Sequence, residues 1–284
     1  MPALKLWDAD FIERGFSGTG AGRLQIWNKT CLIIMRRTYL VKKEADHMII
    51  NQEKCIGCGL CVVYCTGNAI RVENQKASVD LDQCTECGVC RRVAVCPRNA
   101  IEQPPLKWPR SVRAIYSDPL NIHKETGLAG RGTEEIKTND VTNRFKLGEI
   151  GVAIEVGRPN LGCRLRELQK YTNALAQKGI HFEPRNPLTN LIDPISGDLP
   201  QEILNERVIS AIIEFTVPEG EIDWVMQLID QVAQTVDTVT SVDLAGRFND
   251  GWPGEKYLKR VNRSYRPNAK INVGLGRLLD KEEE

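Results

Sequence analysis

Residues 50–70, INQEKCIGCGLCVVYCTGNAI, and residues 79–101, VDLDQCTECGVCRRVAVCPRNAI, are two copies of one cysteine-rich pattern. Each copy has three cysteines at C-x2-C-x2-C spacing and a fourth further on: Cys55, Cys58, Cys61 and Cys65 in the first copy, and Cys84, Cys87, Cys90 and Cys96 in the second. The repeat predicts a duplicated half-domain, in which each copy begins with a short strand and ends with a strand at Ala69-Ile70 or Ala100-Ile101. We expect the copies to meet at a turn formed by Asn74 and Gln75.

The cysteine spacing indicates metal chemistry. Three thiolates two residues apart can ligate one iron-sulfur cube if the backbone between them turns tightly, which Gly57, Gly59 and Gly88 permit. Paired C-x2-C cysteines also bind zinc tetrahedrally, and two zinc sites are the alternative. A zinc site needs only four ligands and does not require a third cysteine at the same short spacing, so the pattern favours two 4Fe-4S clusters.

Residues from about 47 to 104 resemble a bacterial-type two-cluster ferredoxin domain. In such domains the distal cysteine of each run ligates the other cluster. The resemblance therefore implies one [4Fe-4S] cluster held by Cys55, Cys58, Cys61 and Cys96, and a second held by Cys84, Cys87, Cys90 and Cys65. The sequence departs from the family pattern at two places near the distal cysteines. Thr66 stands where a proline usually follows the distal cysteine, and five residues, not three, separate Cys90 from Cys96.

The composition and net charge of the chain do not favour any particular class of binding partner. A net charge of +1 gives no reason to expect binding to nucleic acid or to an acidic membrane. No stretch reaches membrane-spanning length and no cleavable signal is visible, so we expect a cytoplasmic location. The two cysteines outside the repeat, Cys31 and Cys163, are predicted to be small buried side chains and not ligands.

Residues 147–247 show a second pattern, of strands and amphipathic helices in the order βαββαβ. The strands are expected at Gly151–Val156, from Phe182, at Val208–Val217 and at Thr238–Leu244, and the helices from Leu165 and over Ile222–Thr235. This order is typical of the ferredoxin-like sandwich, a topology that implies no cluster. Residues 157–162, GRPNLG, and 179–182, GIHF, further resemble the ACT domain, which implies binding of a small molecule such as an amino acid, or homo-oligomerisation.

The turn after the first of these strands is a candidate ligand site. Arg158, Gly162 and Arg164 lie at the start of a predicted helix, where backbone N–H groups and arginines suit a carboxylate or phosphate. The alternative is an ordinary helix start with solvated arginines.

The predicted fold class is α+β, with a two-cluster ferredoxin domain, an ACT-like α/β sandwich and irregular segments elsewhere. The expected divisions are an N-terminal extension at 1–46, the ferredoxin domain at 47–104, a linker or docking arm at 105–146, the ACT-like domain at 147–247 and a basic tail at 248–284.

No catalytic residues are predicted, because nucleophile-elbow, zincin, P-loop and complete dinucleotide motifs are missing from the sequence. The leading hypothesis is an electron-relay subunit that serves a larger redox enzyme or another electron-transfer protein. Two alternatives stay open: a reductase with its own substrate or flavin site in the C-terminal half, and a regulator that senses a small molecule through the ACT-like domain.

Overall fold

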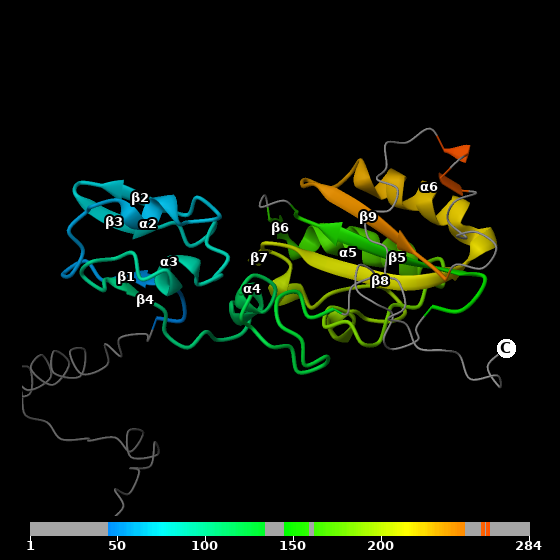
Figure 1. Ribbon diagram of the computed structural model, residues 1–284, viewed down its shortest axis with the longest axis horizontal. Helices are drawn as coiled ribbons and strands as arrows, with labels where there is room; N and C mark the ends of the chain where they lie inside the picture. Colours follow the sequence, from blue (N-terminus) through cyan, green and yellow to red (C-terminus); the bar gives the residue numbers. More distant parts are fainter. Residues whose placement is uncertain (1–44, 134–144, 159–161, 248–256, 259, 262–284) are drawn as a thin grey trace, which may run out of the picture. The chain divides into compact units, whose positions relative to one another are not determined.

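The computed structural model describes residues 45–133, 145–158, 162–247, 257, 258, 260 and 261 (Figure 1). Several sequence expectations fall on other residues: the extension before residue 45, Cys31, part of the 105–146 segment and most of the basic tail. They lie outside the described residues.

The cysteine-rich part is built from two strand pairs and two one-turn helices. Strand β1 (Ile49–Ile50) pairs antiparallel with β4 (Ile101–Glu102), and β2 (Ile70–Glu73) pairs antiparallel with β3 (Lys76–Val79). Helices α2 (Leu60–Val63) and α3 (Val89–Arg92) occupy equivalent places in the two copies. The first strand of one copy thus pairs with the last strand of the other, which agrees with the predicted duplication.

The hairpin between β2 and β3 has a two-residue turn at Asn74 and Gln75. Both residues adopt positive φ, 49° and 59°, as a type I′ turn requires, and this turn suits the right-handed twist of the strands that it joins. The apolar core beneath it is small and is made mostly of Met48, Ile50, Ile70, Ala77, Ala100 and the cysteines themselves. A core of this size gains much of its stability from bound metal or cross-links.

A short helix, α4 (Ser111–Ile115), follows β4 and belongs to a different core. Its buried Val112, together with Tyr116 just after it, packs in the larger hydrophobic cluster of the C-terminal part. The start of the predicted linker is therefore folded and packed.

The C-terminal part is mixed α/β. Its central sheet has the strand order β8-β5-β9 and consists of β5 (Glu149–Val156), β8 (Ala211–Pro218) and β9 (Thr240–Ala245), all antiparallel. Helices α5 (Leu165–Ala176) and α6 (Ile222–Ala233) contact each other and lie behind the sheet in Figure 1. Alternate residues of β5, among them Ile150, Val152 and Ile154, join this helix-covered core, as the period of two in a strand requires.

The remaining elements of this part are short. They are β6 (Cys163–Arg164), which pairs with β7 (Arg207–Val208), and the single turns η2 (Thr189–Leu191), η3 (Gln201–Ile203) and η4 (Glu219–Glu221). No helix in the described ranges is both long and apolar enough to cross a membrane.

Two strand expectations need correction. The strand expected from Phe182 is a single bridge to Phe215. The amide of Glu183 still donates to the Glu214 carbonyl, but the next amide on that side, that of Arg185, donates to the Glu183 side chain and ends the ladder. The strand expected over Val208–Val217 is two separate strands, β7 and β8, since the backbone N–H of Ile209 leaves the ladder and donates to the Ser117 hydroxyl at 2.9 Å.

Candidate iron-sulfur site

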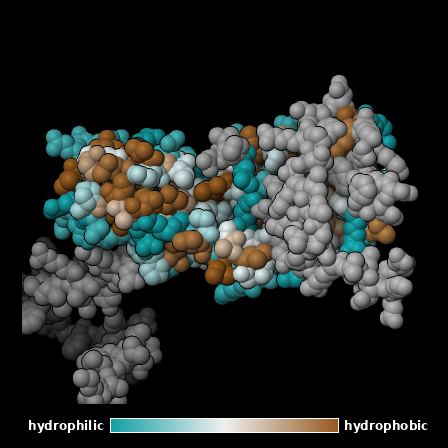
Figure 2. Space-filling model, viewed as in Figure 1, coloured by the Kyte–Doolittle hydropathy of each residue, from teal (hydrophilic) through white to brown (hydrophobic). Residues whose placement is uncertain are grey.

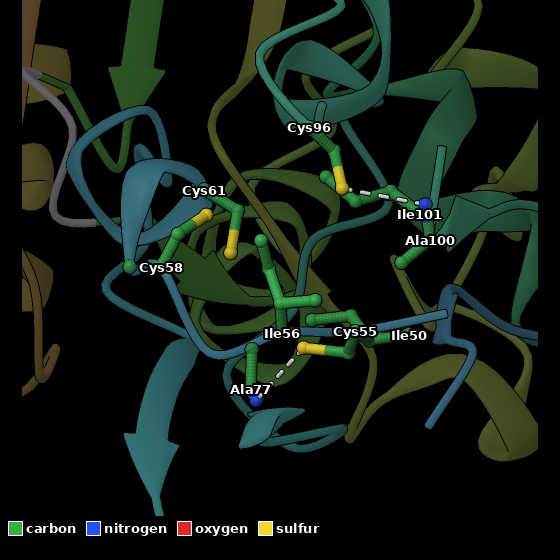
Figure 3. Close-up of a pocket in the computed structure, with 10 residues that line it drawn as sticks. Ile50, Cys55, Ile56, Cys58, Cys61, Ala77, Cys96, Ala100 and Ile101 are labelled. Atoms are coloured by element: carbon green, nitrogen blue, oxygen red, sulfur yellow. Dashed lines mark hydrogen bonds between the residues drawn. The ribbon is translucent and has the colours of Figure 1, made fainter. Parts of the chain in front are cut away.

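Eight thiols lie at two pockets, and each pocket combines both copies of the repeat. The first pocket is lined by Cys55, Cys58 and Cys61 together with Cys96 from the other copy, and Figure 3 shows these four side chains around one space. The second pocket is lined by Cys84, Cys87 and Cys90 together with Cys65. The fold therefore brings three closely spaced thiols and one distant thiol together twice.

Glycines in left-handed conformation produce the turns that carry these thiols. Gly57, Gly59 and Gly88 have φ values of 68°, 77° and 68°, a region that costs other residues energy. Gly59 and Gly88 directly precede α2 and α3, which carry Cys61 and Cys90. A Cβ on Gly57 would lie 2.2 Å from the carbonyl oxygen of Gln75, so this position accepts glycine alone.

Backbone amides donate to the sulfur atoms in a repeated way. The amide of Ala69 donates to Cys65 Sγ at 3.1 Å, and the amide of Ala100 donates to Cys96 Sγ at 3.3 Å, four residues on from the cysteine in both copies. The amide of Ala77 donates to Cys55 Sγ at 3.3 Å. Hydrogen bonds to a thiolate stabilise its charged form, which suits ligation of an electron-poor metal group.

Thr66, the residue that departs from the ferredoxin pattern, lies at the second pocket. Its hydroxyl Oγ1 is 3.5 Å from Cys87 Sγ, which belongs to the other copy of the repeat. A proline at this position would have no hydroxyl to offer.

Burial shifts the pKa of several of these thiols upward. It raises the pKa of Cys84 to about 12 and that of Cys90 to about 11, and it raises the pKa of Cys61 as well. The hydrogen bond from the Ala77 amide instead lowers the pKa of Cys55. Metal-free thiols with raised pKa values hold their protons at neutral pH, so metal binding at the second pocket releases protons.

The donor set fits iron-sulfur chemistry: four thiols at each pocket, apolar lining and amide donors to sulfur. The sequence of residues 47–116 matches the 4Fe-4S dicluster domain family. These residues are a 4Fe-4S dicluster domain. The prediction of two [4Fe-4S] clusters in place of zinc is thereby confirmed. The match ends at residue 116 and leaves the central α/β sheet outside it.

Related proteins match over a similarly short segment. One subunit of the ion-translocating oxidoreductase complex of Methanosarcina acetivorans is 43% identical over 60 residues, which are 21% of this chain and 22% of that protein. Pyruvate synthase subunit PorD of Thermotoga maritima is 41% identical over 58 residues, 20% of this chain and 57% of the subunit. A ferredoxin of Pyrobaculum islandicum is 37% identical over 59 residues, 20% of this chain and 53% of that ferredoxin. This chain thus spans only part of the length of each of these relatives.

A buried carboxylate lies between two cysteines of the dicluster domain and was missed by sequence reasoning. Glu86, between Cys84 and Cys87, is fully buried. Arg110 donates to its oxygen Oε1 from Nε at 2.8 Å and from Nη2 at 2.7 Å, and the amide of Met48 donates to Oε2 at 3.1 Å. These partners are 24 and 38 residues away in sequence, so no local sequence pattern predicts the contacts.

The turn proposed as an anion site holds arginines that already contact carboxylates. Arg158 lies 3.4 Å from Glu155, and Arg164 lies 2.6 Å from Asp82 of the dicluster domain. Gly162 has positive φ, and its amide donates to the carbonyl of Gly157. This geometry gives both arginines acidic neighbours within the chain.

Cys163 is buried, as predicted. The residue is 2% exposed, and burial raises the pKa of its thiol to about 12. The thiol donates to the carbonyl oxygen of Val156 at 3.7 Å and lines neither cysteine pocket.

Proposed function

We propose that this chain is the electron-relay subunit of a multi-subunit oxidoreductase and passes single electrons through its two clusters. The observation that carries this proposal is the convergence of eight thiols at two pockets, each with one thiol from the opposite copy of the repeat. When bound, the clusters supply one-electron redox chemistry. The residues of this chain hold them, exclude water and tune their potentials.

The proposed ligands follow the pocket linings. The cluster at the first pocket, the first cluster, is ligated by Cys55, Cys58, Cys61 and Cys96. The cluster at the second pocket, the second cluster, is ligated by Cys84, Cys87, Cys90 and Cys65. Each cluster then joins the two copies covalently, and this cross-linking compensates for the small apolar core.

The proposed electron partner is a larger redox enzyme or another electron-transfer protein. Two relatives are by name subunits of larger assemblies, one of pyruvate synthase and one of an ion-translocating oxidoreductase complex. The exposed residues around the first pocket support electron exchange with a partner at this place. Cys58 is exposed, and so are the neighbouring Ile56, Leu60 and Val63. Apolar side chains gather on the face of the dicluster domain seen in Figure 2, as a protein partner would require.

For the C-terminal part we propose the ACT-like sandwich. Support comes from the order of the sheet, β9-β5-β8, with Phe182 bridged to the outer side of β8, and from helices between the strands in βαββαβ order. Because Arg158 and Arg164 contact carboxylates of this chain, we propose that this part serves docking or homo-oligomerisation and not capture of a small acid. The domain divisions near residues 47, 105, 147 and 248 belong to the same proposal, as does a cytoplasmic location.

Iron content tests the cluster proposal directly. We expect the full chain, purified under anoxic conditions, to hold about eight irons, because two four-iron clusters require that number. Dithionite reduction should produce iron-sulfur signals in electron paramagnetic resonance spectra. A chain that holds zinc, or far fewer irons after anoxic reconstitution, would contradict the proposal.

The two arginines at the end of α3 give a second prediction. Arg92 pairs with Asp118 at 2.8 Å and donates to the Cys87 carbonyl at 2.6 Å, whereas Arg91 is exposed. We expect replacement of both arginines with Gln to lower the potential of one cluster by on the order of 30 mV, about 0.7 kcal/mol for one electron. Most of this change should come from Arg92→Gln, because solvent screens Arg91. A redox titration in which Arg91→Gln has the larger effect would disprove this ranking.

A further inference from the structure

The loop that carries Cys84 is held by an arginine from outside the repeat. Arg113 lies on α4 and is 4% exposed. Its Nη1 donates to three carbonyl oxygens of the loop: Leu81 at 2.9 Å, Asp82 at 3.1 Å and Cys84 at 2.6 Å. The negative ends of three peptide dipoles therefore converge on one cationic nitrogen.

The same guanidinium has a counter-charge in the α/β part. Nε of Arg113 donates to the carboxylate of Glu206, the residue immediately before β7, and the Glu206 side chain is 15% exposed. One side chain thus connects the backbone carbonyl of Cys84, which lines the second pocket, with a carboxylate outside the dicluster domain. Arg110, the residue before α4, also donates to the Leu81 carbonyl at 2.9 Å and pairs with Glu86.

The chemistry of Arg113 at this place has two consequences. Nη1 has two hydrogen atoms for three acceptors, so it shares its donors and holds the loop as a bound cation would. A buried positive charge also favours the more negative, reduced form of a nearby cluster, because little water is present to screen it. The carboxylate of Glu206 offsets part of this charge, so the net field at the loop depends on both residues.

We infer that Arg113 is a positioning residue that fixes the Leu81–Cys84 loop and raises the reduction potential of the second cluster, and that Glu206 moderates this effect from the α/β part. The inference rests on the proposed ligands of the second pocket. It gives the C-terminal part a role in setting the driving force of electron transfer.

The test compares two charge-neutralising substitutions in the full chain by redox titration. Arg113→Gln should shift one of the two cluster couples to a more negative potential and leave the other in place. Glu206→Gln should shift that same couple in the opposite direction, because it removes the counter-charge and leaves the guanidinium. Arg113→Lys keeps a cation with three donors, so its shift should be smaller than that of Arg113→Gln.

A purely structural role would give a different result. Loosening of the loop by either substitution would shift the couple in the same direction in both variants, and that outcome, or an unchanged pair of couples, would overturn the inference. Arg166→Gln is the matched control, since Arg166 is half exposed, contacts Glu167 and Asn205, and should move neither couple. If the Arg113→Gln variant loses its clusters, the direction of the potential shift in Glu206→Gln tests the inference by itself: a shift to a more positive potential supports it, and a shift to a more negative potential overturns it.

The readouts separate this inference from the proposed function. Wild-type chain without about eight irons would refute the cluster proposal itself. Wild-type chain with full iron and variants whose couples do not move would refute only the role of Arg113.

Discussion

Cys96→Ser is expected to remove the first cluster and to leave the second. Cys96 comes from the second copy of the repeat, yet its thiol lines the pocket of Cys55, Cys58 and Cys61. A serine hydroxyl keeps its proton at neutral pH and is a harder ligand than a thiolate, so the fourth iron loses its anchor. We expect the iron content to fall from about eight to about four per chain. Iron analysis and electron paramagnetic resonance of the reduced protein measure both changes.

The matched variant is Cys65→Ser, in which the first copy loses its distal thiol. Cys65 lines the second pocket, so this variant should keep the cluster that Cys96→Ser loses, and the two residual spectra should differ. Cys163→Ser is the control for a cysteine outside both pockets and should retain all of the iron. Identical residual spectra from Cys96→Ser and Cys65→Ser would refute the crossed ligand assignment.

Gly57→Ala is expected to destabilise the dicluster domain strongly. The new methyl group would lie 2.2 Å from the carbonyl oxygen and 2.5 Å from the carbonyl carbon of Gln75, which are backbone atoms of the β2–β3 turn. The positive φ costs an alanine about 1–2 kcal/mol, and overpacking adds about 1–3 kcal/mol, so we expect a loss of about 2–5 kcal/mol. Chemical unfolding of the iron-loaded chain under anoxia measures this loss, and a lower iron content should accompany it.

Gly59→Ala separates the two causes. Gly59 has φ 77°, but a Cβ there would meet no atom within 4 Å. This variant carries the backbone strain without the collision, so its loss of stability should be only about 1–2 kcal/mol. If the two alanine variants lose equal stability, the contact with Gln75 contributes nothing.

The dicluster domain was largely predictable because its information is local and repeated. The cysteine spacing specifies the ligand type, and the 29-residue offset between the copies shows which segments are equivalent. The strands at Ala69-Ile70 and Ala100-Ile101 and the Asn74-Gln75 turn follow from the same comparison, and Ile70, Ile101 and the turn take these roles in the structure. The departure at Thr66 was visible in the sequence, but its contact with Cys87 was not.

For the C-terminal part, the sequence predicted the order of the helices and strands, but not where two of the strands begin and end. Helical and strand patterns identify α5, α6, β5 and β9 within a few residues, because each helix buries one face and β5 is buried along nearly its whole length. The strand at Phe182 is shortened to one bridge, and the stretch at Val208–Val217 is divided at Ile209. The residue responsible for that division, Ser117, lies 92 positions earlier in the chain, beyond the reach of any local pattern.

By itself the sequence determined the chemistry of this protein: eight thiols in two equivalent runs specify two clusters, since ligand type and spacing are properties of neighbouring residues. The tertiary structure alone decided what surrounds those thiols. Glu86, Arg110, Arg113 and Glu206 are ordinary charged residues in the sequence, and only folding pairs Arg110 with the buried Glu86 and the buried Arg113 with Glu206. Their effect depends on distance and burial, because a charge acts strongly where water cannot screen it.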